Sequence, residues 1–185
     1  RFSQVLSLGN SLRDLTLKVH EYERTQKDYK PFFAPLSHLQ NLHKLNLKLL
    51  MRYAMGEKRV TSFLFDRISW LKNLREFSIK IQIGYSPGFN DEVITLLGKA
   101  IEVLINLRKF KFKCDELRDF DSFEYKGLSN LMSSLNKLEK IESLTLSFHY
   151  FTRFFSNHMN GIASCEDLFH KIRKFRLDIL DCDDI

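Results

Sequence analysis

The stretch LQNLHKLNLKL, residues 39–49, spaces its apolar side chains in two different ways. Its first leucines are three residues apart, which is the spacing of one face of a helix. Its last leucines, Leu45, Leu47 and Leu49, alternate with polar residues, as in a β-strand that is buried on one face. The stretch therefore predicts a chain that leaves a helix and enters a strand.

The same pattern recurs six times along the chain, and its third apolar position marks each copy. These positions are Leu15, Leu45, Phe77, Phe110, Leu144 and Phe175. Successive copies are therefore 30–34 residues apart. A fixed period of this length is the signature of an architecture built from stacked repeats.

Helices are expected between the strands, because apolar residues recur there at helical spacing. Asn90 precedes two acidic residues and is predicted to cap one helix, and Ser164 with Asp167 resembles a capping box. The expected helices cover residues 61–74, 90–104 and 122–141. Polar loops are expected over residues 21–30, 84–90 and 115–121.

These units predict an α/β fold, because strands joined through helices run parallel. No unit can bury its apolar face alone, so the units are expected to stack. Residues 1–185 would then form a single domain, with a parallel sheet on the concave face of an arc and helices on its convex face. The chain begins with Arg1 inside an apolar pattern, so we expect it to be an excerpt of a longer protein.

The segments LQNLHKLNL (39–47) and LKNLREFSI (71–79) resemble leucine-rich repeats of the long, ribonuclease-inhibitor-like type. The resemblance covers essentially the whole chain and implies a horseshoe-shaped solenoid of about six repeats. The abundance of Phe, Lys and Asn resembles divergent members of the family from protists. The family's usual Asn or Cys after the strand is absent, and the matching positions hold His20, Leu50, Gln82, Asp115, His149 and Leu180.

Composition limits the environment and the partners. The formal net charge is +6 and the sequence pI about 9.2, which suits an acidic partner. Cys114, Cys165 and Cys182 are too widely spaced for a zinc knuckle or a disulfide framework, which favours a reducing compartment, the cytoplasm or the nucleus. No apolar run reaches the length of about 18 residues that a membrane span requires.

Between the apolar strand residues, variable positions are expected to form columns across the concave face. One column consists of Thr16, Asn46, Ser78, Lys111, Thr145 and Arg176, and the next of Lys18, Lys48, Lys80, Lys113, Ser147 and Asp178. Like charges on neighbouring strands repel each other, so an anionic partner or another group is expected to compensate them. The candidate binding residues are Lys18, Lys48, Lys80, Lys111, Lys113 and Arg176. Alternatively, these lysines are only solvated and discourage aggregation.

A second candidate surface consists of loop residues, because loop insertions of a solenoid fall along one edge and often bind partners. These residues are Tyr22, Tyr29, Arg52, Tyr53 and Arg153. Catalysis finds little support, since no nucleophile, metal-binding or phosphate-binding motif is present. Cys114 is expected in the core. We therefore expect no enzyme activity, no cofactor and no metal.

The expected function is a non-catalytic protein–protein interaction scaffold within a larger assembly. Its partner would be an acidic protein, with no membrane and no small-molecule substrate involved. An alternative is an RNA-associated subunit whose basic face contacts phosphates. Two further alternatives are a cytoskeletal or ciliary component, facing acidic tubulin tails, and the substrate-recognition arm of a ubiquitin ligase.

Overall fold

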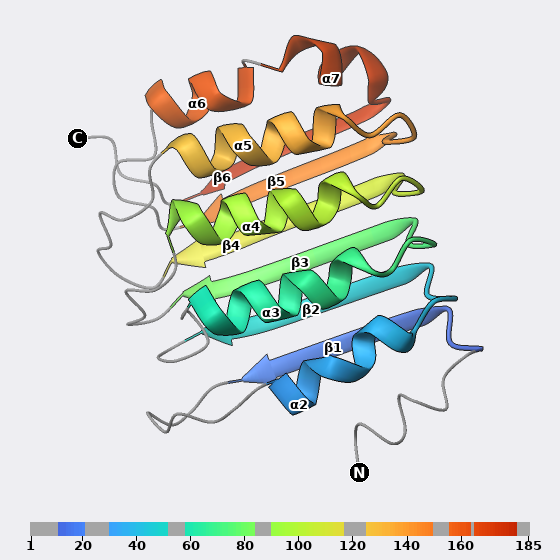
Figure 1. Ribbon diagram of the computed structural model, residues 1–185. Helices are drawn as coiled ribbons and strands as arrows, with labels where there is room; N and C mark the ends of the chain where they lie inside the picture. Colours follow the sequence, from blue (N-terminus) through green and yellow to red (C-terminus); the bar gives the residue numbers. More distant parts are fainter. Residues whose placement is uncertain are drawn as a thin grey trace.

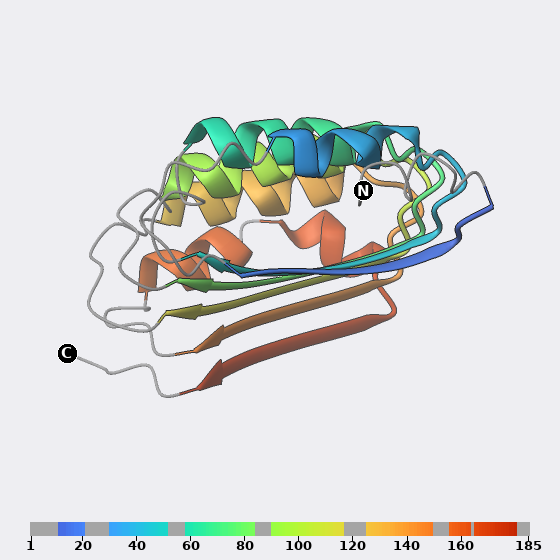
Figure 2. The same ribbon diagram turned by 90° about the horizontal axis from the view of Figure 1, so that it is seen from below.

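Six parallel strands form one sheet, and helices cover only one of its two faces (Figures 1 and 2). The computed structural model describes residues 11–20, 30–51, 58–83, 90–116, 125–149, 156–163 and 165–180. Within these ranges strands and helices alternate along the chain, as the change of periodicity predicted. The α/β class is therefore confirmed.

The strands lie in the order in which they occur in the sequence. They are β1 (Asp14–His20), β2 (Lys44–Met51), β3 (Glu76–Ile83), β4 (Lys109–Glu116), β5 (Ser143–His149) and β6 (Lys174–Leu180). All five neighbouring pairs are parallel, and all keep the register predicted from the repeat. One boundary was wrong: Asp115 lies within β4 and not in a polar loop.

The helical elements lie together on one side of the sheet. They are α2 (Lys30–Phe33), the 3-10 helix η1 (Ala34–His38), α3 (Lys58–Ser69), α4 (Asp91–Glu102), α5 (Tyr125–Asn136), α6 (Ser156–Ala163) and α7 (Glu166–Lys171). None of the helices in the described ranges is long and apolar enough to cross a membrane.

The predicted helices extend too far toward the strands. The leucines spaced by three belong to single turns, in which the N–H of Leu74 donates to the carbonyl of Leu71 at 3.0 Å and Leu107 donates to Leu104 at 2.8 Å. Such a turn places a side chain every three residues without a continuous helix. A spacing of three was therefore interpreted as helix where the chain makes a tight turn.

Of the two predicted helix caps, one is confirmed. The Oδ1 of Asn90 accepts hydrogen bonds from the backbone N–H of Glu92 at 3.0 Å and of Val93 at 3.4 Å. The N-cap of α7 is Cys165, which makes no side-chain cap. Ser164, at which the capping box was predicted, lies outside the described residues.

The core lies between the sheet and the helices, and phenylalanines fill much of it. Phe77 packs against Phe110 with ring centroids 5.7 Å apart, and Phe112 packs against Phe148 at 5.8 Å. Both pairs join neighbouring strands, so the core is continuous along the sheet. Cys114 is fully buried in this core, as predicted.

Close packing between α4 and α5 depends on Gly127. A Cβ atom at this position would lie 2.7 Å from the carbonyl oxygen and 2.8 Å from the Cα of Asp91. At Gly98 a Cβ atom would lie 3.0 Å from the Ser134 hydroxyl, which can rotate away, and 3.3 and 3.4 Å from backbone atoms of Leu131 and Asn130, so the approach is less close than at Gly127.

We expect Gly127→Ala to lower the free energy of unfolding by about 1–3 kcal/mol, because backbone atoms of α4 must shift to admit the methyl group. Gly98→Ala is the matched control, since it adds the same methyl group on the neighbouring helix. Urea denaturation of both variants checks this expectation. Equal stability of the two variants would contradict the close approach of Gly127 to α4.

Candidate binding surface on the open face of the sheet

No helix in the described ranges covers the second face of the sheet, called here the open face (Figure 2). Four rows of side chains cross it from β1 to β6. The first row is Asp14, Lys44, Glu76, Lys109, Ser143 and Lys174, and the second is Thr16, Asn46, Ser78, Lys111, Thr145 and Arg176. The third is Lys18, Lys48, Lys80, Lys113, Ser147 and Asp178, and the fourth is His20, Leu50, Gln82, Asp115, His149 and Leu180.

The open face is strongly basic. Its four rows hold nine lysine and arginine side chains against four carboxylates, a formal net charge of +5 for a chain whose total is +6. The predicted columns are confirmed, because Lys18, Lys48, Lys80 and Lys113 occupy register positions on consecutive strands. All six residues predicted for the concave face lie on this face.

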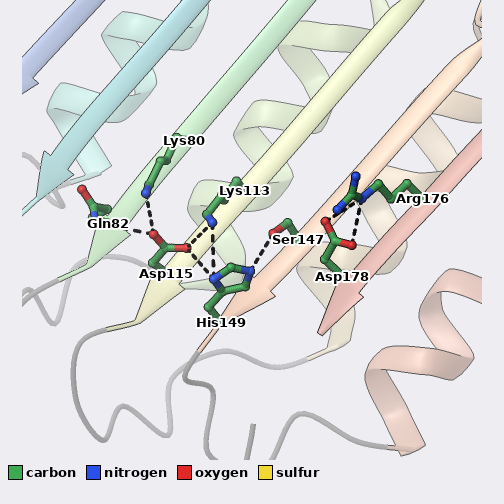
Figure 3. A network of polar contacts seen from close by, with 8 residues as sticks. All are labelled: Lys80, Gln82, Lys113, Asp115, Ser147, His149, Arg176 and Asp178. Carbon is green, nitrogen blue, oxygen red and sulfur yellow. Dashed lines mark hydrogen bonds and ion pairs between the residues drawn. The ribbon is translucent and has the colours of Figure 1, made fainter. Parts of the chain in front are cut away.

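Asp115 compensates two of the four aligned lysines (Figure 3). One of its carboxylate oxygens lies 2.7 Å from the Nζ of Lys80, and the other lies 3.5 Å from the Nζ of Lys113. The amide of Gln82 contacts the same oxygen as Lys80 at 3.5 Å. Asp115 is only 6% exposed, so its charge is poorly screened by water and acts strongly on both lysines.

His149 extends the cluster toward β5. Its Nδ1 lies 3.5 Å from Asp115 and 3.3 Å from the Nζ of Lys113, and its Nε2 lies 3.0 Å from the hydroxyl of Ser147 (Figure 3). The order Ser–His–Asp is that of a nucleophilic triad. The Nδ1 of His149, however, lies beside both the Lys113 ammonium, which can only donate a hydrogen bond, and the Asp115 carboxylate, which can only accept one. The carboxylate is therefore not an exclusive partner of the ring, as it is in a triad.

Glu76 holds two further lysines at the opposite ends of the strands. Its carboxylate lies 2.6 Å from the Nζ of Lys109 and 3.5 Å from that of Lys44. The hydrogen bond from Lys109 is the main cause that lowers the pKa of Glu76 below its ordinary value, and the same bond raises the pKa of Lys109. Both lysines lie about half exposed, so solvent weakens these pairs.

A shallow hollow of about 340 Å³ lies beside Glu76, over β2 to β5. Hydroxyl and amide groups line it together with one lysine that has no carboxylate partner among the described residues. These residues are Asn46, Ser78, Lys111, Ser143 and Thr145. Glu76 and its partners Lys44 and Lys109 also line the hollow, so it combines one ion-paired cluster with neutral hydrogen-bonding groups around Lys111.

The structure divides the predicted basic residues into two groups. Lys80 and Lys113 are held by Asp115, and Arg176 is held by Asp178 through two contacts of 2.9 Å. The remaining residues of this set form no ion pair with any described residue and are called here the free lysines: Lys18, Lys48 and Lys111. These three have charge available for a partner.

The predicted loop surface lies outside the described residues. It comprises Tyr22, Tyr29, Arg52, Tyr53 and Arg153. The prediction of a binding edge at these loops therefore stays a prediction.

Sequence reasoning missed Asp115, Ser147 and His149 as one cluster. Asp115 was assigned to a loop, although it lies two residues after Lys113 and therefore has the same strand parity. Aligning the repeats by column to the end of each strand places Asp115 beside His149. The signal was therefore in the repeat pattern, and the early end assigned to the strand hid it.

We expect Asp115→Asn to lower the free energy of unfolding by about 1–3 kcal/mol, because two aligned lysines lose their shared carboxylate. Adding Lys80→Met should restore part of this loss by removing one of the two charges. Glu142→Gln is the matched control, since its carboxylate pairs with Arg108 at 3.1 Å in an exposed position. Equal losses for Asp115 and Glu142, measured by urea denaturation, would contradict the role of Asp115.

The Glu76→Gln variant tests the ion pairs of Glu76 with Lys44 and Lys109 through the pH dependence of stability. Because the pKa of Glu76 is lowered in the folded state, its stabilisation is present above the ordinary pKa of 4.5 and is lost as pH falls through the lower folded value. The variant should therefore be less stable than the wild type near pH 7, by less than about 1 kcal/mol, and equally stable near pH 2. Thermal unfolding across this range gives the difference, and a constant difference at all pH values would refute the ion pair.

Within the described residues, no group of His, Cys, Asp and Glu side chains is arranged to hold a metal ion. Comparison with known proteins identifies no family: no family model matches the sequence, and no curated protein matches it significantly.

Proposed function

We propose that this chain is a non-catalytic interaction scaffold that binds an acidic protein segment on the open face of its sheet. The observation that supports this function is the set of free lysines on a sheet face that no described helix covers. Lysines that form no internal ion pair can exchange water for an anionic partner without first breaking a bond.

The paired lysines have a different role in this proposal. Asp115 pairs with Lys80 and Lys113 and offsets one of their two positive charges, so these three groups together keep a formal charge of +1. The free lysines would then attract the partner, while the fixed cluster limits how it can lie. Attraction of this kind raises the association rate and depends on ionic strength.

Acidic protein is favoured over RNA because the open face lacks stacking groups. Its four rows contain no Phe, Tyr or Trp among the described residues, and sequence-independent binding of single-stranded RNA commonly uses base stacking on aromatic rings. Lys111 and the hydroxyl groups of the hollow can donate hydrogen bonds to a carboxylate side chain as well as to a phosphate. An enzymatic role has less support, because Asp115 shares the Nδ1 of His149 with Lys113 and also pairs with Lys80.

The wider context of the proposal follows from the resemblance to leucine-rich repeats. The parallel sheet and alternating helices suit a horseshoe-shaped solenoid, in which the open face would be the concave one. We place the scaffold in a larger cytoplasmic assembly. A cytoskeletal or ciliary assembly with acidic tubulin tails would satisfy the same charge requirement.

Binding of two labelled probes tests this function: a peptide rich in Asp and Glu, and a single-stranded RNA of equal charge. We expect the peptide to bind, and Lys48→Glu with Lys111→Glu to weaken it roughly tenfold or more. Lys99→Glu with Lys126→Glu is the matched control, because it makes the same charge change on exposed positions of α4 and α5 and should alter affinity less than about twofold.

The two probes separate the alternatives. Tighter binding of RNA than of the peptide, with the same dependence on Lys48 and Lys111, would replace the acidic-protein proposal by the RNA-associated one. Equal effects of the two double variants would show that only net charge matters and that the open face is not the binding surface.

A further inference from the structure

The last strand, β6, buries its helix-facing side chains less than any other described strand from β2 onward. Phe175 is 39% exposed, whereas the residues aligned with it on β2 to β5 are at most 1% exposed. Leu177 and Ile179 are only partly buried, although their counterparts on β2 to β5 are fully buried. Among the described residues, the apolar side chains of β6 are therefore less well covered than those of β2 to β5.

The neighbouring helices explain this exposure. The connections from β2 to β5 each contain one helix of twelve residues, α3, α4 and α5, whereas the connection from β5 to β6 contains two shorter helices, α6 of eight residues and α7 of six. In the described ranges β6 also has a strand on one side only, so its outer backbone groups have no strand to pair with. An edge strand of this kind is a template for a further strand.

The opposite edge of the same sheet has matching features. β1 is the other edge strand of the described sheet and runs parallel to β6. A copy of β1 placed beside β6 in the register of the five existing pairs would continue every row of the sheet. The apolar rows would then join Leu15 to Phe175, Leu17 to Leu177 and Val19 to Ile179.

The charged rows also match in this register. Asp14 would lie beside Lys174, and Lys18 beside Asp178, whose carboxylate also pairs with Arg176 of its own strand. One new pair of opposite charges would therefore form across the junction, and Lys18 would share a second carboxylate with Arg176. Opposite charges on neighbouring strands are favourable, and like charges are unfavourable. Neither Asp14 nor Lys174 forms an ion pair with a described residue, so both charges are available.

We propose that the β6 edge binds the β1 edge of a second copy of this chain, as a parallel strand in the register of the sheet. The contact is heterologous, because the two copies use different edges, and each dimer keeps one free edge of each kind. Longer assemblies therefore form at higher concentration. This inference does not depend on the proposed binding of an acidic segment, because that surface is the face of the sheet and this one is its edge.

Charge reversal at the junction gives the sharpest test. Sedimentation equilibrium of the wild-type chain at increasing concentration should show dimers and larger species. Asp14→Lys and Lys174→Asp should each raise the dissociation constant roughly tenfold, since each replaces an attractive pair by a repulsive one. The double variant should return to the wild-type value, because it restores a pair of opposite charges with the two signs exchanged between the strands.

A mixture of the two single variants is the second part of the test. The Asp14→Lys copy and the Lys174→Asp copy carry opposite charges at both junctions that they can form with each other, whereas junctions between like copies are repulsive. The mixture should therefore form dimers and larger species at concentrations at which neither single variant associates. Far-UV circular dichroism of every variant checks the fold. Hydrogen exchange of the wild-type chain adds a readout without mutation: amides of β6 should gain protection with concentration, and those of β3 should not.

Three results would overturn the proposal. The first is a monomer at all concentrations up to about 100 µM, a range in which specific edge pairing is detectable. The second is association that Asp14→Lys leaves unchanged, since a two-fold contact between two β6 edges does not involve β1. The third is a double variant whose dissociation constant is as high as those of the single variants.

Discussion

The constant register between neighbouring strands is the constraint on which the rest of the structure depends. It is set where each strand begins: the carbonyl of His43 accepts hydrogen bonds from Arg75 and Glu76 at 2.8 and 2.9 Å, and that of Arg75 accepts from Arg108 and Lys109 at 2.8 and 3.0 Å. A slip by one residue would turn every apolar side chain toward water. Because the register is the same at all five junctions, equivalent positions of the repeats become rows of neighbours.

Rows of identical residues are favourable in the core and unfavourable on the open face. In the core, Phe77 and Phe110 pack as neighbours because the register aligns them. On the open face the same alignment brings lysines together, and strands about 4.8 Å apart leave little room for counter-ions. The carboxylate of Asp115 reduces this repulsion between β3 and β4, because it pairs with Lys80 and Lys113 at once. Among the described residues, no carboxylate pairs with Lys18 on β1 or Lys48 on β2.

Most of the fold could be predicted from the sequence, because apolar side chains define both the period and the face of each strand. The rows of the open face followed from the same alignment, including the lysines. The ends of elements could not be predicted, since they depend on backbone hydrogen bonds: the turn at Leu71 has the leucine spacing of a helix without being one. The cluster of Asp115, Ser147 and His149 was missed for the same reason, because β4 continues past its last apolar residue.

The same register rule connects the two proposed surfaces. Lys18 and Lys48 have no carboxylate partner among the described residues of the open face because they lie on β1 and β2, beyond the reach of Asp115 on β4. In the proposed contact between copies, Lys18 lies beside Asp178 of the second copy and shares its carboxylate with Arg176 of that copy. Stacking would therefore neutralise part of the open face at each junction while lengthening it. An acidic segment and a second copy then compete for Lys18 but not for Lys48 or Lys111.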